Sequence, residues 1–407
     1  MADIDLIGAD RDGSAGNGDK AAGRKRPAYK ERINRHRSRI LRLQLLVVLL
    51  LAAAVILVIW LLQNRRYTRT ELTKVTDFVA EEGSQYLNFN GFIVQYGPNG
   101  AACLDTGGKL IWNITYEMDK PIVSTAENVL AIADYGGRTI YVMNTRKQLG
   151  TIETNLPIHM IAASACGEVA AVTDDKTTTW VRLFQSDGTE IAYFVRSMSE
   201  NGYPLSVAVS PDGEQICMSS LKMQDSAVKT YVSFYDFSSA GQKYAEHRVG
   251  NFEYKDEIFP YLYYMDAGTC VAASDARAVF FDTSAVEPVN GTNHMLQDEL
   301  QGIFGSRDYM GLLFADRTGQ NLYRIDLYDR SGKQAGSVGF TMTYEQVRIE
   351  GERIYISNQR GCQIYSVDGQ TLFAGGFDRA VSILIPSSRL NRLTAVSENE
   401  IDEVKLR

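Results

Sequence analysis

Cysteine is scarce in this chain of 407 residues. The five that occur are scattered, with no C-x-x-C pair and no two adjacent, at Cys103, Cys166, Cys217, Cys270 and Cys362. The number is odd, and the spacings match neither a disulfide framework nor a zinc site, so we expect neither. We interpret the cysteines as small, buried residues of strands.

Histidine and catalytic motifs are also rare. Beyond the N-terminal tail only His159, His247 and His294 occur, and no G-x-S-x-G, H-E-x-x-H or P-loop sequence is present. A hydrolase needs a nucleophile within hydrogen-bonding distance of a base, and no motif in the sequence indicates such a pair. We therefore expect no catalytic residue, no metal ligand and no cofactor. An enzyme whose site assembles from distant loops stays open as the alternative.

One long hydrophobic run is present, and polar residues are missing from it. Leu45–Leu62 holds 18 consecutive apolar residues, which as a helix span about 27 Å, close to the thickness of a bilayer core. A buried core helix rarely lacks a polar face, and a cleaved signal peptide has a shorter apolar region and a cleavage site after it. The run predicts an uncleaved transmembrane helix over residues 43–62.

Charge is distributed unevenly about this run. Nine Lys or Arg residues lie within 24–42, whereas only Arg65, Arg66 and Arg69 follow the run closely. The positive-inside rule then predicts a cytoplasmic N-terminus and an extracellular remainder of the chain. Residues 1–42 sum to +5 and residues 63–407 to −12. The acidic outer part argues against a nucleic-acid partner, and the basic flank is expected to rest on anionic lipid.

A repeat runs through the rest of the chain. Pairs of short alternating strands surround polar turns, which we mark by Gly107, Thr145, Gly188, Ala240, Ser284, Gly332 and Gly369. The spacings of these markers are 38, 43, 52, 44, 48 and 37 residues, with a mean near 44. A period of about 40–50 residues with alternating strands is typical of a β-propeller.

The ends of the chain suggest how such a ring closes. Three strand-like segments follow Gly369, and one strand-like segment without partners lies near residues 71–80. We expect the C-terminus to supply three inner strands of an eighth blade and residues 71–80 the outer one, because an open ring leaves unpaired edges. A seven-bladed ring is the alternative. The predicted domains are a largely disordered cytoplasmic tail (1–42), a transmembrane helix (43–62), a tether (63–70) and an all-β propeller (71–407).

The stretch "AACLDTGGKLIWNI", residues 101–114, resembles the A-x-D-x-x-T-G-K-x-x-W repeat of quinoprotein dehydrogenases. In those propellers the Trp and Gly pack neighbouring blades, so the resemblance implies a structural role for Trp112. The vicinal cysteines of their quinone site are absent here, and we expect no quinone. The turn "SPDG" resembles turns of WD40-like propellers. The layout as a whole resembles an uncharacterised family of single-pass, membrane-anchored propellers from Gram-positive Firmicutes, a domain of unknown function.

One aromatic segment is a candidate binding surface. "FPYLYY" supplies Phe259, Tyr261, Tyr263 and Tyr264, and in a strand the first three share one face. Such aromatics stack on sugars or anchor peptides when exposed, and pack between blades when buried. We expect a non-catalytic extracytoplasmic module that binds a protein or a cell-envelope polymer. The alternative is an enzyme or small-ligand binder that uses the central channel, such as a quinoprotein-like dehydrogenase.

Overall fold

The structure, a computed structural model, describes residues 29–63, 65–78, 83–224, 227–387, 389 and 391–407. The chain divides into two compact units, Met1–Leu61 and Leu62–Arg407. Residues 1–28 of the tail expected to be largely disordered (1–42) lie outside the described residues.

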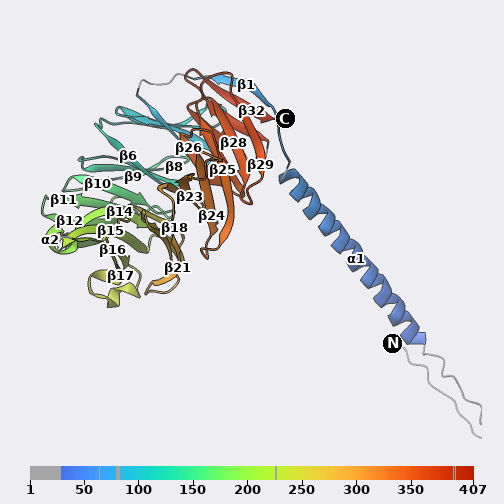
Figure 1. Ribbon diagram of the computed structural model, residues 1–407, viewed down its shortest axis with the longest axis horizontal. Helices are drawn as coiled ribbons and strands as arrows, with labels where there is room; N and C mark the ends of the chain where they lie inside the picture. Colours follow the sequence, from blue (N-terminus) through green and yellow to red (C-terminus); the bar gives the residue numbers. More distant parts are fainter. Residues whose placement is uncertain (1–28, 64, 79–82, 225–226, 388, 390) are drawn as a thin grey trace, which may run out of the picture. The chain divides into compact units, whose positions relative to one another are not determined.

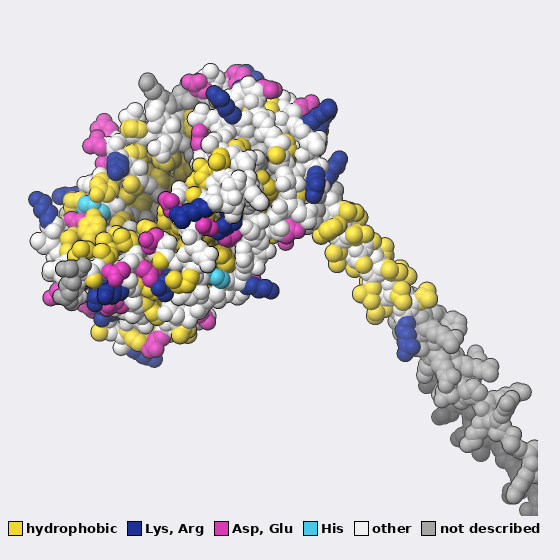
Figure 2. Space-filling model, viewed as in Figure 1, with side chains coloured by type: hydrophobic (Ala, Val, Ile, Leu, Met, Phe, Trp, Pro, Cys, Tyr) yellow, Lys and Arg dark blue, Asp and Glu magenta, His cyan; other side chains and the backbone are white. Residues whose placement is uncertain are grey.

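One long helix, α1 (Tyr29–Gln63), makes up the described part of the first unit, and its last two residues belong to the second. Its described large apolar side chains are all exposed, and the exposed fraction lies between 48% at Val47 and 70% at Leu43. Figure 2 shows these side chains along the helix. Over the described residues, no helix combines the length and apolarity that a bilayer crossing requires. The side chains of Ile59 and Leu62, which belong to the predicted span, lie outside the described ones.

The described residues of the second unit form eight four-stranded antiparallel sheets, which are the blades of a propeller (Figure 1). The first strand of each blade is its inner strand, and at most junctions it contacts the first strand of the neighbouring blade. These inner strands of blades 1 to 8 are β2 (Gln85–Phe89), β6 (Pro121–Ala126), β10 (Ile158–Ala163), β14 (Tyr203–Val209), β18 (Tyr261–Asp266), β22 (Leu300–Gly305), β26 (Gln346–Glu350) and β30 (Ile383–Pro386).

Each blade continues outward through three further strands. The second strands are β3 (Phe92–Gly97), β7 (Val129–Asp134), β11 (Val169–Asp174), β15 (Gln215–Gln224), β19 (Thr269–Ala273), β23 (Tyr309–Ala315), β27 (Arg353–Asn358) and β31 (Arg392–Val396). The third strands are β4 (Gly100–Leu104), β8 (Thr139–Asn144), β12 (Thr178–Phe184), β16 (Ala227–Asp236), β20 (Arg277–Asp282), β24 (Tyr323–Asp329), β28 (Gly361–Ser366) and β32 (Glu400–Leu406). The outer strands are β5 (Leu110–Thr115), β9 (Gln148–Glu153), β13 (Glu190–Ser197), β17 (Arg248–Lys255), β21 (Val289–Met295), β25 (Gln334–Phe340), β29 (Thr371–Gly376) and β1 (Thr70–Asp77).

The eighth blade confirms the predicted closure. Its strand order is β1-β32-β31-β30, so the C-terminus supplies the three inner strands and the segment after α1 supplies the outer one. Figure 1 shows β1, in blue, beside β32, in red. The chain joins the propeller before the boundary expected at residue 71, because Tyr67 is buried and its N–H donates to the Leu372 carbonyl oxygen at 2.7 Å.

Burial along the strands explains their composition. The second strand of blade 2, β7, is buried at five consecutive positions, whereas the outer strand β9 has only one buried residue. A middle strand has a neighbouring blade against each face and is therefore apolar at most of its buried positions, whereas an outer strand faces solvent. The core is thus a series of hydrophobic layers between adjacent blades, such as the cluster joining blades 2 and 3.

Several of the turns between third and outer strands are held by aspartate side chains. Asp329 accepts the backbone N–H groups of Ser331 at 2.9 Å and Lys333 at 3.0 Å. Gly332 has a φ of +75°, and a Cβ there would lie 2.6 Å from Cβ of Thr292 in the preceding blade. Only glycine fits this combination of backbone conformation and close approach.

Four of the five cysteines are buried strand residues, as predicted: Cys103, Cys217, Cys270 and Cys362. The expectation is wrong for Cys166, which is exposed in the turn that joins β10 to β11. The turn is held by Ser164 rather than by Cys166. The Ser164 Oγ atom accepts hydrogen bonds from the backbone N–H groups of Gly167 and Glu168.

Candidate functional site

Trp112 lies between blades 1 and 2. Its side chain belongs to a buried cluster that includes Cys103 and Met143, and 8% of the residue is exposed. The indole N–H donates to the carbonyl oxygen of Asn144 in the next blade at 2.8 Å. The residue that carries the resemblance to quinoprotein repeats therefore joins two blades through packing and one hydrogen bond.

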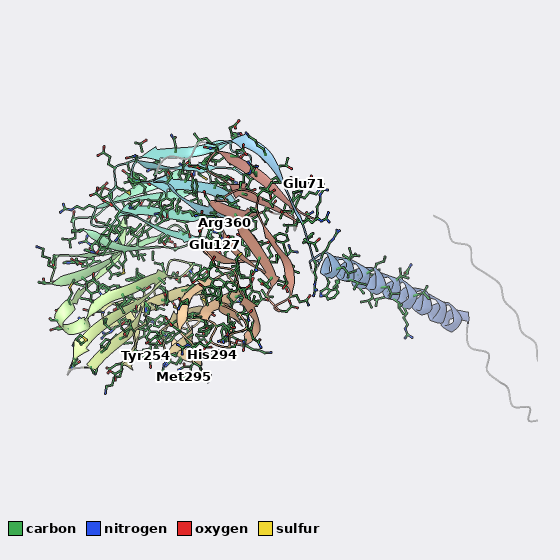
Figure 3. The ribbon with its side chains drawn as sticks, turned by 45° about the horizontal axis from the view of Figure 1, so that its top comes forward. Glu71, Glu127, Tyr254, His294, Met295 and Arg360 are labelled. Atoms are coloured by element: carbon green, nitrogen blue, oxygen red, sulfur yellow. The ribbon has the colours of Figure 1, made fainter. Side chains whose placement is uncertain are left out.

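The "FPYLYY" aromatics separate into two groups rather than sharing one face. Phe259 precedes β18 and is fully buried. Its ring centre lies 4.4 Å from that of Tyr254, and Tyr254 is labelled in Figure 3. With Tyr264 it belongs to the cluster between blades 4 and 5. The expected shared face of Phe259, Tyr261 and Tyr263 is therefore wrong, because strand alternation begins only at Tyr261.

The other two aromatics pack toward blade 6. Tyr261 and Tyr263 are half-buried against the cluster between blades 5 and 6. The ring of Tyr263 lies over Gly305 of β22, where a Cβ would come within 2.5 Å of the ring Cε1. Of the four aromatics, Tyr263 and Tyr264 also line a cavity at the channel.

That cavity, of about 410 Å³, lies where inner strands β6, β10, β14, β18 and β22 end. Small apolar residues make up much of its wall, and its charged lining is Glu127 and Arg307 (Glu127 is labelled in Figure 3). Burial, together with the nearby Glu127 carboxylate, raises the pKa of Tyr263. Among the described residues that line the cavity, Glu127 is the single carboxylate, so the converging carboxylates that would hold a calcium-bound quinone are not found there.

The three histidines of the propeller lie in different blades and have different partners. His159 Nε2 lies 2.9 Å from Asp174 Oδ2, and His294 Nε2 lies 2.5 Å from the Gly332 carbonyl oxygen. The His247 ring lies 5.1 Å from that of Phe237. Within the described part of the chain, no three His, Cys, Asp or Glu residues are grouped as metal ligands would be.

Two exposed tyrosines lie near charged side chains at the ends of strands in blades 2 to 4. Tyr135 follows β7 and is 43% exposed, and Tyr203 begins β14 and is 45% exposed. The Nζ atom of Lys120 lies 4.7 Å from the Tyr135 ring centre, and the His159 ring lies edge-on to that ring at 5.2 Å. We call these residues, with Asp174, the Tyr135–Tyr203 cluster.

The cluster is electrostatically connected and held by backbone hydrogen bonds. Partial burial raises the pKa of Tyr203, and the neighbouring Tyr135 and Asp174 raise it further. The Tyr135 N–H donates to the Lys120 carbonyl oxygen at 3.0 Å, and the Gly136 N–H donates to the Ile158 carbonyl oxygen at 2.7 Å. Its aromatic rings are thus presented to solvent from a fixed turn, as binding residues on rigid scaffolds usually are.

This cluster was not predicted from the sequence. Tyr135 stands in "DYGG", directly after an apolar strand and before two glycines, and an aromatic residue in such a turn is a signal that was available. Tyr203 offers no comparable signal, because it looks like any aromatic at the start of a strand. Their proximity depends on the stacking of three blades.

Comparisons with solved structures agree with the propeller fold. BamB from Moraxella catarrhalis superposes with a TM-score of 0.50 at 13% identity, over 83% of this chain and 100% of that one. Sqt1 from Chaetomium thermophilum gives a TM-score of 0.52 at 12% identity, over 83% of this chain and 98% of the other. At such identities the likeness concerns the fold alone. A comparison with curated proteins returned no match.

Residues 63–406 match the model of a family of unknown function, DUF5711, and the chain belongs to that family.

Proposed function

We propose that this member of DUF5711 is a non-catalytic interaction module that is anchored in the cell membrane and binds a protein or a cell-envelope polymer through one face of its propeller. The proposal combines the ring architecture, the exposed Tyr135–Tyr203 cluster and the apolar segment before the propeller. A propeller suits this role because closed blades hold their turns in a fixed arrangement.

The Tyr135–Tyr203 cluster is the observation that carries the proposal. Tyrosine is enriched in binding hot spots, because its ring contributes a large contact area while its hydroxyl group keeps a hydrogen-bonding end. Here two half-exposed tyrosines lie beside a cation, Lys120, and an anion, Asp174. An apolar centre with charged groups around it is the usual composition of a protein-binding patch.

The membrane anchor is proposed from the sequence. Leu45–Leu62 is long enough to cross a bilayer core, and the nine basic residues before it favour a cytoplasmic N-terminus. The propeller then lies outside the cell. Its acidic balance, −12 over residues 63–407, speaks against nucleic acid and against direct attraction to anionic lipid.

Site-directed photo-crosslinking in living cells tests the binding face. A photoreactive amino acid placed at Tyr135 or Tyr203 is expected to capture the same partner, whether protein or envelope polymer. The matched control is Tyr193, which is 53% exposed on the outer strand β13 and has its ring 5.7 Å from that of Trp180. Equal capture from all three positions, or capture from Tyr193 alone, contradicts the proposed face.

A further inference from the structure

A second cavity lies between blades 3 and 4, beside the start of inner strand β14, where Gly202 and Pro204 line it. Its volume is about 190 Å³. Blade 3 contributes Thr179 of β12 and Arg196 of β13, and blade 4 contributes the alternate residues Tyr231, Ser233 and Tyr235 of β16. Drug-sized ligands occupy cavities of about 300–1,000 Å³, so this one suits a smaller molecule.

Arg196 is the buried charge of the cavity. Its side chain is 7% exposed, and its Nε and Nη2 atoms each donate to the Tyr235 hydroxyl oxygen at 3.1 Å. The Tyr235 ring stacks on Phe194 with 3.8 Å between ring centres, and the guanidinium lies 5.3 Å from the Tyr235 ring centre. A buried guanidinium held by a neutral hydroxyl still requires a negative partner.

The negative partner comes from a poorly buried segment. Glu246 Oε2 accepts from Arg196 Nη1 at 2.5 Å, but the Glu246 side chain is 55% exposed. Glu246 and His247 have φ values of 55° and 58°, the left-handed region that residues with a Cβ seldom adopt. They lie in the connection 237–247 of blade 4, whereas blade 6 joins the equivalent strands through residues 330–333. The long connection is thus strained where it supplies a carboxylate.

Two further groups in the cavity wall have donors to offer. Thr179 is 1% exposed, and its Oγ1 has no hydrogen-bond partner among the described residues. A buried hydroxyl without a hydrogen-bond partner is uncommon, because its loss of hydration is not compensated. A ligand atom that accepts a hydrogen bond from this hydroxyl would compensate for that loss. Arg248 and Glu200 are both exposed at the cavity, where Arg248 adds a second guanidinium and Glu200 adds one carboxylate.

We propose that this cavity binds a small organic carboxylate. The ligand's carboxylate replaces that of Glu246 on Arg196, and a second polar atom of the ligand accepts from Thr179 Oγ1. The class of ligand follows from Glu246 itself, because the group that Arg196 already binds is a carboxylate and guanidinium matches carboxylate geometry. Glu246 then acts as an internal competitor whose release also relieves its backbone strain. This site does not depend on the Tyr135–Tyr203 cluster.

Calorimetric titration of the purified full-length chain in mild detergent tests the proposal. The probes are succinate and D-glucuronate, with succinamide and D-glucose as their uncharged counterparts and inorganic phosphate as a different anion. We expect saturable binding of at least one carboxylate and none of its uncharged counterpart. Two outcomes overturn the assignment. In the first, phosphate binds in preference to both acids; in the second, both the native chain and the Glu246→Gln variant fail to bind either acid.

Three variants then separate the roles. Glu246→Gln keeps the side-chain shape, removes the competing charge and is expected to tighten carboxylate binding at least threefold. Thr179→Val keeps the volume, loses the hydroxyl and is expected to weaken binding about threefold to tenfold, as for one hydrogen bond. Glu190→Gln is the matched control, since Glu190 pairs with Arg182 of the same blade at 3.1 Å and does not line the cavity. An unchanged affinity in Glu246→Gln, or an equal change in Glu190→Gln, contradicts competition by Glu246.

Discussion

Thr70 lies opposite Leu406 in the antiparallel pair of β1 and β32, so the first and last strands of the propeller close its ring. The backbone N–H of Arg407 donates to the Arg69 carbonyl oxygen at 2.9 Å, and the Arg69 N–H donates to the Arg407 carbonyl oxygen at 3.0 Å. An ion pair between Arg407 and Glu71, at 2.5 Å, lies beside them. The ring is therefore fastened by residues more than 300 positions apart in the chain.

Deleting residues 70–77 is expected to remove the outer strand of blade 8 and expose the edge of β32. We expect the free energy of unfolding to fall by several kcal/mol, a large share of a typical domain's stability, and the protein to aggregate. Urea denaturation and light scattering measure the two effects. Thr73→Ala, an exposed position in the same strand, is the control and should change little. A deletion variant that unfolds like the native chain would contradict closure by β1.

Substituting Trp112 tests whether it joins blades 1 and 2. Trp112→Ala should lower the free energy of unfolding by about 3–5 kcal/mol, as large-to-small core changes do. Trp112→Phe keeps a ring but loses the donor to Asn144, which should lower it by about 1–3 kcal/mol. Denaturation in urea gives both values. Equal stability of the Ala variant and the native chain would remove the packing role.

Because the turn aspartates have lowered pKa values, we expect the propeller to lose stability in acid. Partial burial favours the neutral form of Asp329, but hydrogen bonds from Ser331 and Lys333 outweigh it, so the pKa of Asp329 lies below its ordinary value of 3.8. The pKa of Asp282 is lowered chiefly by the Ser284 side chain and backbone. A carboxyl whose folded pKa is lowered contributes stability above its unfolded pKa, and that contribution disappears as the pH falls through the folded pKa.

Asp329→Asn measures this contribution at one turn. The amide oxygen still accepts the backbone N–H groups, but the side chain no longer ionises. We expect the native chain to be more stable than the variant at pH 7, by no more than about 1 kcal/mol because solvent screens the turn. The difference should shrink as the pH falls below 3.8. A difference that stays constant between pH 7 and pH 3 would show that ionisation of Asp329 does not matter.

Protease accessibility tests the proposed membrane topology. Protease added to intact protoplasts is expected to reach residues 63–407 and to spare residues 1–42, because the nine basic residues of 24–42 favour the cytoplasm. An epitope tag at each end reports the two outcomes by immunoblot. Lysed protoplasts, in which both tags are accessible, provide the control. Survival of the C-terminal tag in intact protoplasts would contradict the predicted orientation.

The sequence by itself determined the blades. Each blade is a local unit of about 44 residues, and its alternating strands and aspartate- or glycine-rich turns are visible without any long-range contact. The closing strand was predicted, because one unpaired strand before the first repeat and three after the last complete an eighth blade. A seven-bladed ring remained the alternative until the order β1-β32-β31-β30 decided between them. The longest spacing of the markers, 52 residues from Gly188 to Ala240, includes the extended hairpin of β15 and β16.

Only the tertiary structure decided which side chains meet. The sequence placed Phe259 on the face of Tyr261 and Tyr263, but Phe259 lies outside β18 and packs on Tyr254 instead. Tyr135 and Tyr203 lie in blades 2 and 4, and Arg196 and Glu246 in blades 3 and 4, so each pair depends on how whole blades stack. Strand periodicity specifies the face of a residue within its own sheet, whereas contacts between sheets follow from their packing around the ring.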